Sequence, residues 1–228
     1  MKIKILAPLL LLITISSFSQ VNDNFKAALN TDKFDLQGNG MYVPGVALSN
    51  YIKGDVHLFP NWNGQFTVIT KKGDSRQLIN LNYNLQTKKL ESFISKDSVF
   101  QFDLEQFDYI IVANKKYKVI NGAQLNGLVL EIFDGQKVKL FNEIHIEVER
   151  GVVNPMTQTM ISDDKYVQVF TYYLFLNGNQ VKIKLSKSDI LKQLIDKKDA
   201  LKEFASKNDL SFSKEEDIIL ILKYYDSL

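Results

Sequence analysis

The chain has 228 residues, 45% of them apolar, and no cysteine, so its stability depends on a hydrophobic core and not on disulfide bonds. Two of its 28 basic residues, Lys2 and Lys4, precede residue 20, and the 26 that remain balance 26 acidic residues. The formal net charge of +2 for the whole chain therefore becomes zero once residues 1–19 are removed. A chain with no net charge and no sustained basic segment has no general attraction for phosphate backbones, which argues against nucleic acid as a partner.

Residues 1–19 are predicted to be a secretory signal peptide. Two lysines precede an apolar run over residues 5–15, and the small residues Ser17 and Ser19 fit cleavage before Gln20. No later apolar run is long enough to cross a membrane. We therefore expect an exported chain, periplasmic or secreted, that is soluble and has no transmembrane segment after cleavage.

Residues 20–185 are predicted to form an antiparallel β domain, because apolar and polar residues mostly alternate from residue 56 onward. In residues 79–85 every odd position is apolar and every even position is asparagine, which predicts one packed face and one solvated face. The dipeptides Asp134-Gly135 and Asn177-Gly178 each separate two such segments, as in β-hairpins.

Residues 186–228 are predicted to be helical, because apolar residues there recur three and four apart. Two apolar faces are separated by an expected break near residues 196–199. Ser213 and Glu216 have the spacing of a capping box, so a helix is expected to start at Ser213. Five consecutive aliphatic residues at 218–222 predict a helix buried on more than one side.

The predicted fold class is therefore mainly β with C-terminal α. We expect an antiparallel curved meander or sandwich, with short helices packed on it at the C-terminal end.

Nothing in the chain matches a catalytic motif, and we favour a protein that is not an enzyme and needs no cofactor. His57 and His145 are the two histidines available as bases, and neither lies in a recognisable nucleophile or metal motif. A pair of carboxylates as in glycan hydrolases remains possible, but no spacing indicates one.

One group of side chains that can bind metal ions is predicted to share one face of a strand. Glu143, His145, Glu147 and Glu149 share one face if their segment is a strand. Imidazole between carboxylates could bind a divalent metal, but the alternation also describes an ordinary solvated strand face. We favour the solvated face and predict no metal site.

Two further segments are candidates for binding. Trp62 lies in a predicted turn, where it can contact a partner or a sugar, or fold back over the edge of the sheet. Residues 151–165 are too apolar for a solvated loop of that length, and they predict either a packed flap or a contact surface.

Three passages together resemble uncharacterised exported β-rich proteins of Bacteroidota, particularly flavobacteria. They are the Ser17-Phe18-Ser19-Gln20 end of the leader, the strand at residues 81–91, and the lysine-rich tail at residues 187–225 with its Tyr224-Tyr225 pair. The resemblance implies a bacterial envelope or secreted setting and brings no catalytic residues.

Taken together, these features favour a non-enzymatic binding or interaction module of the cell envelope, with Trp62, Glu143, His145 and Glu147 as candidate binding residues. The alternative is a periplasmic carrier of an acyl chain or other amphiphile, which needs an apolar void of several hundred Å³. A hydrolase acting on glycans is third. The expected partner is an envelope protein or a small amphiphilic ligand.

Cleavage before Gln20 is directly testable, because the intact mass of the exported protein reports its first residue. We expect a mature chain that begins at Gln20. A mature form that still carries Met1, or one that stays in the cytoplasm, would contradict the predicted export.

Overall fold

The computed structural model describes residues 30–31, 34–35, 40–44, 52–95 and 98–228. The predicted signal peptide over residues 1–19 lies outside them. Within the described part, none of the helices is long and apolar enough to span a membrane.

Most of the chain forms a large open sheet with the order β15-β14-β13-β12-β11-β10-β5-β6, to which the short strand β4 adds beside β14. Neighbouring strands are antiparallel, except that β4 runs parallel to β14. Its strands are β4 (Ile52–Lys53), β5 (Gln65–Thr70), β6 (Ser75–Ile79), β10 (Phe107–Val112), β11 (Lys115–Asn121), β12 (Asn126–Asp134), β13 (Val138–Glu149), β14 (Asp164–Leu176) and β15 (Asn179–Ile183).

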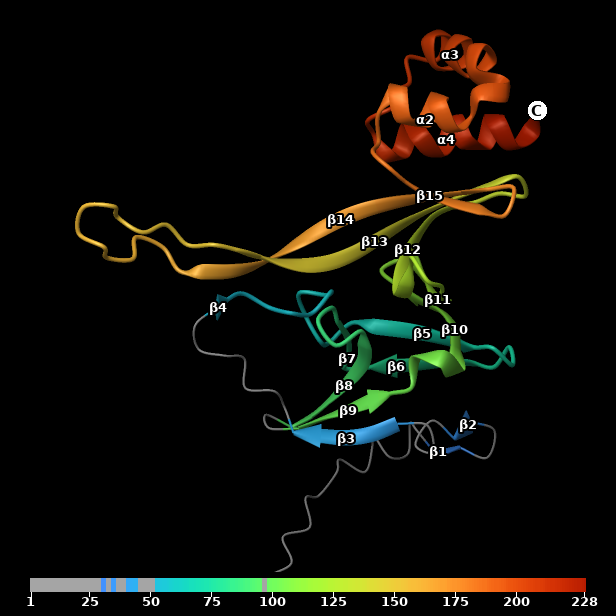
Figure 1. Ribbon diagram of the computed structural model, residues 1–228. Coiled ribbons are helices and arrows are strands. Elements are labelled where there is room, and N and C mark those ends of the chain that lie inside the picture. The colour runs from blue at the N-terminus through green and yellow to red at the C-terminus, as the bar shows by residue number, and fades with distance from the viewer. Residues whose placement is uncertain (1–29, 32–33, 36–39, 45–51, 96–97) are drawn as a thin grey trace, which may run out of the picture.

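A second, four-stranded sheet has the order β3-β9-β8-β7 and lies below β13 and β14 of the large sheet in Figure 1. Its strands are β3 (Gly40–Pro44), β7 (Leu81–Asn84), β8 (Lys89–Ser95) and β9 (Ser98–Phe102), and a short 3-10 helix, η2 (Leu104–Gln106), follows them. The strands β1 (Asn30–Thr31) and β2 (Phe34–Asp35) pair separately.

The two sheets share a hydrophobic core. Phe66 and Val68 of the large sheet and Leu90 and Phe100 of the small sheet are almost completely buried in one cluster. The fold therefore combines the two expected forms, because strands β10 to β15 are a continuous antiparallel meander whose first half packs on another sheet as in a sandwich. The mainly β fold class is confirmed.

Both predicted hairpins are confirmed. Asp134-Gly135 lies at the turn between β12 and β13, and Asn177-Gly178 lies between β14 and β15. Asn177 and Gly178 both have positive φ, of 51° and 78°, as a tight hairpin turn requires.

The predicted solvated face of residues 79–85 is wrong. Asn80, with φ 60°, breaks the segment, so Ile79 ends β6 with 61% of its surface exposed while β7 is buried on both faces. The Asn82 side chain accepts from the backbone N–H of Phe59 and donates to its carbonyl. These bonds satisfy the buried amide, so the Asn82 side chain holds the neighbouring backbone at Phe59 and does not face solvent.

Three helices cover one end of the large sheet, above β14 and β15 in Figure 1. They are α2 (Lys187–Gln193), α3 (Lys198–Lys207) and α4 (Glu215–Ser227), and the expected break is the 3-10 turn η3 (Ile195–Lys197). Leu201 and Leu222 pack with Leu140 and Leu174 of the sheet in a second core.

Helix α4 differs from its prediction at the cap. It begins at Glu215, after an N-cap at Lys214 that makes no side-chain capping bond, so Ser213 is not the cap. Polar contacts with the sheet place it instead, since Tyr172 Oη donates to Glu215 Oε2 and Asp226 accepts the backbone N–H groups of residues 136 and 137. Leu220 is exposed, but α4 contacts both the helix α3 and the strands β12 and β13, so the predicted burial on more than one side is confirmed.

The stability of this end should therefore depend on packing and not on capping. We expect Leu222→Ala to lower the free energy of unfolding by about 2–5 kcal/mol, because Leu222 is fully buried. Ser213→Ala should change it by less than about 0.5 kcal/mol. Urea unfolding of the two variants measures both, and equal losses would contradict this assignment.

Candidate functional site

The long hairpin of β13 and β14 extends beyond its neighbours. The two strands pair from Val138↔Leu176 to Glu149↔Lys165, whereas β12 pairs with β13 only as far as Asn142, and β15 pairs with β14 only from Tyr172. Residues 143–171 thus continue as a two-stranded ribbon, called the arm here, which projects sideways from the body in Figure 1.

The end of the arm, residues 151–163, is called the tip, and backbone bonds hold its shape. The N–H of Asn154 donates to the carbonyl of Thr159, and the N–H of Gln158 donates back to the carbonyl of Asn154. Asn154 Oδ1 accepts from the N–H of Met156 at 2.9 Å, and the N–H of Ile161 donates to the carbonyl of Val152 at 2.7 Å. The tip is therefore an ordered loop.

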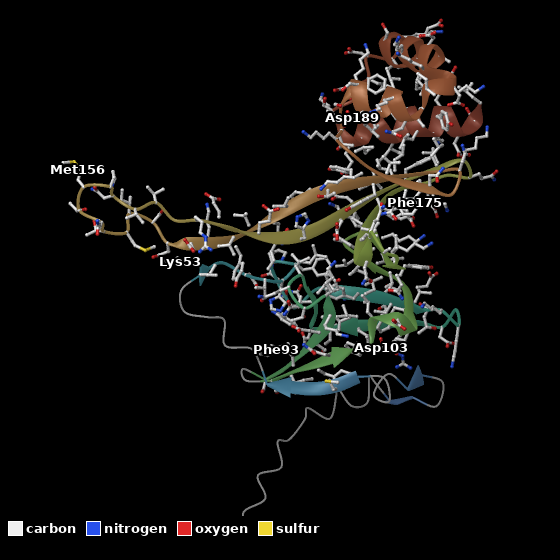
Figure 2. All side chains as sticks on the ribbon, viewed as in Figure 1. Lys53, Phe93, Asp103, Met156, Phe175 and Asp189 are labelled. Atoms are coloured by element: carbon white, nitrogen blue, oxygen red, sulfur yellow. The ribbon has the colours of Figure 1, made fainter. Side chains whose placement is uncertain are left out.

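The tip carries its apolar side chains on the outside. Met156, at the end of the arm in Figure 2, is 92% exposed. The other exposed apolar side chains of the tip are Val152, Val153, Met160 and Ile161. Of the two predictions for residues 151–165, the contact surface agrees with this exposure, because no other part of the described chain covers these side chains.

Charged residues around the base of the tip neutralise one another. The pairs are Lys53 with Asp163 at 2.5 Å, Arg150 with Asp164 at 2.5 Å, and Lys165 with Glu149 at 3.3 Å. The N–H of Gly151 and the Arg150 guanidinium, both donating to Asp164, hold the pKa of that carboxyl below its usual value. Three cations thus face three anions, and the base of the tip has no net charge.

A segment from the N-terminal part of the chain ties the arm to the body. Residues 52–58, called the strap here, begin with β4, which pairs with β14 at Asp164 and Lys165. Farther along, the carbonyl of Val56 accepts from the N–H of Leu85, and the N–H of Leu58 donates to the carbonyl of Tyr83. The strap therefore connects the arm with the end of β7 in the small sheet.

The middle of the strap is held by a histidine between two carboxylates. His57 Nδ1 lies 2.6 Å from Asp55 Oδ1, and His57 Nε2 lies 3.1 Å from Glu91 Oε2. Burial of the ring by itself lowers its pKa, but the hydrogen bonds to Glu91 and Asp55 outweigh burial, and the pKa of His57 is raised. Asn84 and Gln101 donate to the other oxygen of Glu91.

This arrangement opposes a catalytic role for His57. Both ring nitrogens face carboxylate oxygens, so neither nitrogen is directed at a nucleophile whose proton it could accept. A histidine hydrogen-bonded to two carboxylates stabilises the fold, and its charge depends on pH.

Trp62, a predicted binding residue, packs against this histidine. Its ring centroid lies 4.7 Å from that of His57, edge to face, and 5.9 Å from that of Phe93. The side chain is half-buried. Of the alternatives set out for Trp62, folding back onto the protein agrees with these contacts.

The predicted strand face is present. Glu143, His145 and Glu147 lie at alternate positions of β13 and therefore on one face. Glu143 has other partners, since it accepts from Tyr173 Oη at 3.3 Å and lies 3.5 Å from Lys88 Nζ. That position is largely buried, and the expectation of a solvated side chain there is wrong.

His145 and Glu147 remain close, with Nε2 and Oε1 3.5 Å apart, while His145 Nδ1 is buried and has no hydrogen-bond partner among the described residues. Across those residues, no three histidine, aspartate or glutamate side chains are grouped so as to hold a metal ion.

A cavity of about 540 Å³ opens beside β3 and β9. Its lining includes Lys89, Gln101, Asp103 and Glu105, together with Met41 and Phe102. A carrier for an acyl chain encloses its ligand in an apolar void, and a lining with three charged residues does not fit that ligand.

Sequence reasoning identified the tip, Trp62 and both histidines but missed the strap. Glu91 is 34 positions from His57, and Gln168, which joins the arm to the strap, is 111 positions away. The spacing of Asp55 and His57 is the one local signal. Comparison of the chain with models of protein families, with curated proteins and with solved structures finds no match.

The absence of a grouped ligand set on β13 gives a direct test. Adding Zn²⁺ should leave the melting temperature unchanged, because a ligand stabilises a fold only if it binds the folded state preferentially. A rise in melting temperature with Zn²⁺ that His145→Ala abolishes would establish a site. The same substitution in metal-free buffer controls for loss of stability.

Proposed function

We propose that the protein is an exported, non-enzymatic interaction module of the cell envelope that binds a partner protein through the tip of its arm. The observation that carries this proposal is the outward apolar surface of an internally hydrogen-bonded tip. Export rests on the leader at residues 1–19 and on the resemblance to exported proteins of Bacteroidota.

The exposed tip residues have no role in the two main cores. The buried clusters are formed by the sheets and the helices, and the tip lies outside both. A contiguous apolar surface that the fold does not use is typical of a contact site for another molecule.

The free energy that the tip can gain by burying its apolar side chains is close to the cost of association, so it matters that the tip is already ordered. Full burial of one Val, Met or Ile side chain contributes roughly 1.5–3 kcal/mol, so the five exposed side chains supply roughly 7–15 kcal/mol at most. Association itself costs roughly 4–15 kcal/mol. Because these ranges overlap, a tip that had to be ordered on binding would bind weakly, and the hydrogen bonds of Asn154 reduce that cost.

The chemistry of the tip favours a protein pocket over a lipid surface. Peripheral membrane segments combine aromatic anchors with an excess of Lys and Arg. Residues 151–163 contain no aromatic residue, and the charges at their base are paired. The expected partner surface is an apolar pocket without strong charge. A non-enzymatic role is consistent with the occupied nitrogens of His57.

Site-specific cross-linking in the native envelope tests this proposal. A photoreactive amino acid in place of Met156 should give a discrete adduct with a protein. The same amino acid in place of Leu220, an exposed apolar residue of α4, should give none. Ile161→Ser should reduce the adduct by about tenfold, since it removes one exposed apolar contact and keeps the backbone bond to Val152.

Vesicles provide the opposing test. Neutral vesicles and vesicles with anionic lipid should both leave the protein in solution. Adducts with lipid, or co-sedimentation that Ile161→Ser abolishes, would replace the partner protein with a membrane. Equal adducts from the Met156 and Leu220 positions would contradict a binding role of the tip.

A further inference from the structure

We propose that the strap is a proton-controlled contact, in which protonated His57 holds residues 52–58 against Glu91 of the small sheet and so keeps them beside the arm, and in which loss of that proton releases them. This inference rests on the proposed role of the arm, because it makes the position of the binding tip sensitive to pH. It concerns contacts within one chain and can be tested without a partner.

The ring of His57 lies between two carboxylates. The charged groups facing His57 are Asp55 of the strap and Glu91 of β8, each on one ring nitrogen. Trp62 covers the ring without a charge of its own. The imidazolium ion has two N–H groups and so satisfies both carboxylates at once.

Loss of the proton from His57 leaves one of the two carboxylates without a hydrogen-bond donor from the ring. A neutral imidazole has one N–H and one lone pair, so one carboxylate then faces a lone pair. Asp55 is exposed and can turn to water, but the Glu91 side chain is only 4% exposed. A buried carboxylate that loses a charged partner is strongly unfavourable, and moving the strap away lets water reach it.

His57 is also connected with the arm. Gln168 Nε2 of β14 lies 3.1 Å from the carbonyl oxygens of both His57 and Leu58. Gly54 lies so close to β14 that an added Cβ would be 3.1 Å from the carbonyl oxygen of Tyr166, and its φ of +100° favours glycine. Displacement of His57 therefore removes contacts along the arm as well as the bond to Glu91.

The direction of the pH effect follows from linkage. The pKa of His57 is raised in the folded protein, so the closed strap binds the proton more tightly than the open strap does. Closure is fully favoured below about pH 6.5, the ordinary value for histidine, and is lost as the pH rises through the raised value. The opening equilibrium changes by roughly tenfold for every pH unit that separates the two values.

The chain carries its own reporter for this titration. Trp62 is its single tryptophan, and its ring lies against His57. An imidazolium ion quenches the fluorescence of an adjoining indole, so we expect emission to rise with pH, with a midpoint above about 6.5. His57→Gln should abolish the transition. The matched control His145→Gln changes the other histidine, on the arm, and should leave it intact.

Hydrogen exchange then decides whether the proton controls the strap. We expect amide protection of residues 52–58, measured relative to helices α2 to α4, to fall across the pH range in which Trp62 titrates. The helices correct for the intrinsic pH dependence of exchange. The wild-type protein alone decides this point, so the test survives if His57→Gln fails to fold.

Two outcomes would overturn the inference. One is equal relative protection of the strap on both sides of the Trp62 transition. The other is a transition that persists in folded His57→Gln. Neither outcome bears on cross-linking from Met156, and failed cross-linking with a normal strap transition would reject the proposed function while leaving the proton-controlled contact in place.

Discussion

The pairing of β13 with β14 is the constraint on which the rest of the molecule depends. One face of this ladder carries Leu140 and Leu174 beneath the helices and, farther along, Ile144 against the core between the sheets. A twisted ladder can turn one face toward two different layers along its length. Because the ladder also outruns β12 and β15, the same pairing that joins both cores produces the arm.

Buried polar groups specify how the layers meet. Asn82 fixes the segment at Phe59 through both its amide atoms, and Glu91 is satisfied by His57, Asn84 and Gln101. Such groups are costly unless every bond is made, so they select one arrangement of the strap over other arrangements that apolar packing alone would tolerate. At the opposite end, partly exposed polar contacts position α4, through Asp226 and the hydroxyl of Tyr172.

The tip exposes apolar side chains, whereas the strap covers polar ones. The tip keeps its backbone bonds internal and leaves its apolar side chains in water, so it has surface free energy available for a partner. The strap holds the His57 ring between two carboxylates, and we propose that its closure depends on one proton. Because β4 pairs directly behind the tip, at Asp164 and Lys165, the two features share the same stretch of β14. The proposed binding surface and the proposed pH-sensitive contact are thus joined through neighbouring residues of one strand.

From the sequence alone, alternation and turn dipeptides determined the mainly β class, the two hairpins at Asp134-Gly135 and Asn177-Gly178, and the change to helix after residue 185. Each of these is set by neighbours a few residues apart. Tertiary structure alone decided that Asn82 is buried, that Ser213 does not cap α4, that residues 151–163 project outward, and that His57 meets Glu91. The spacing of apolar residues along the chain predicts which side chains share a face. The segments that cover that face are distant in the sequence, so no local pattern predicts the contact.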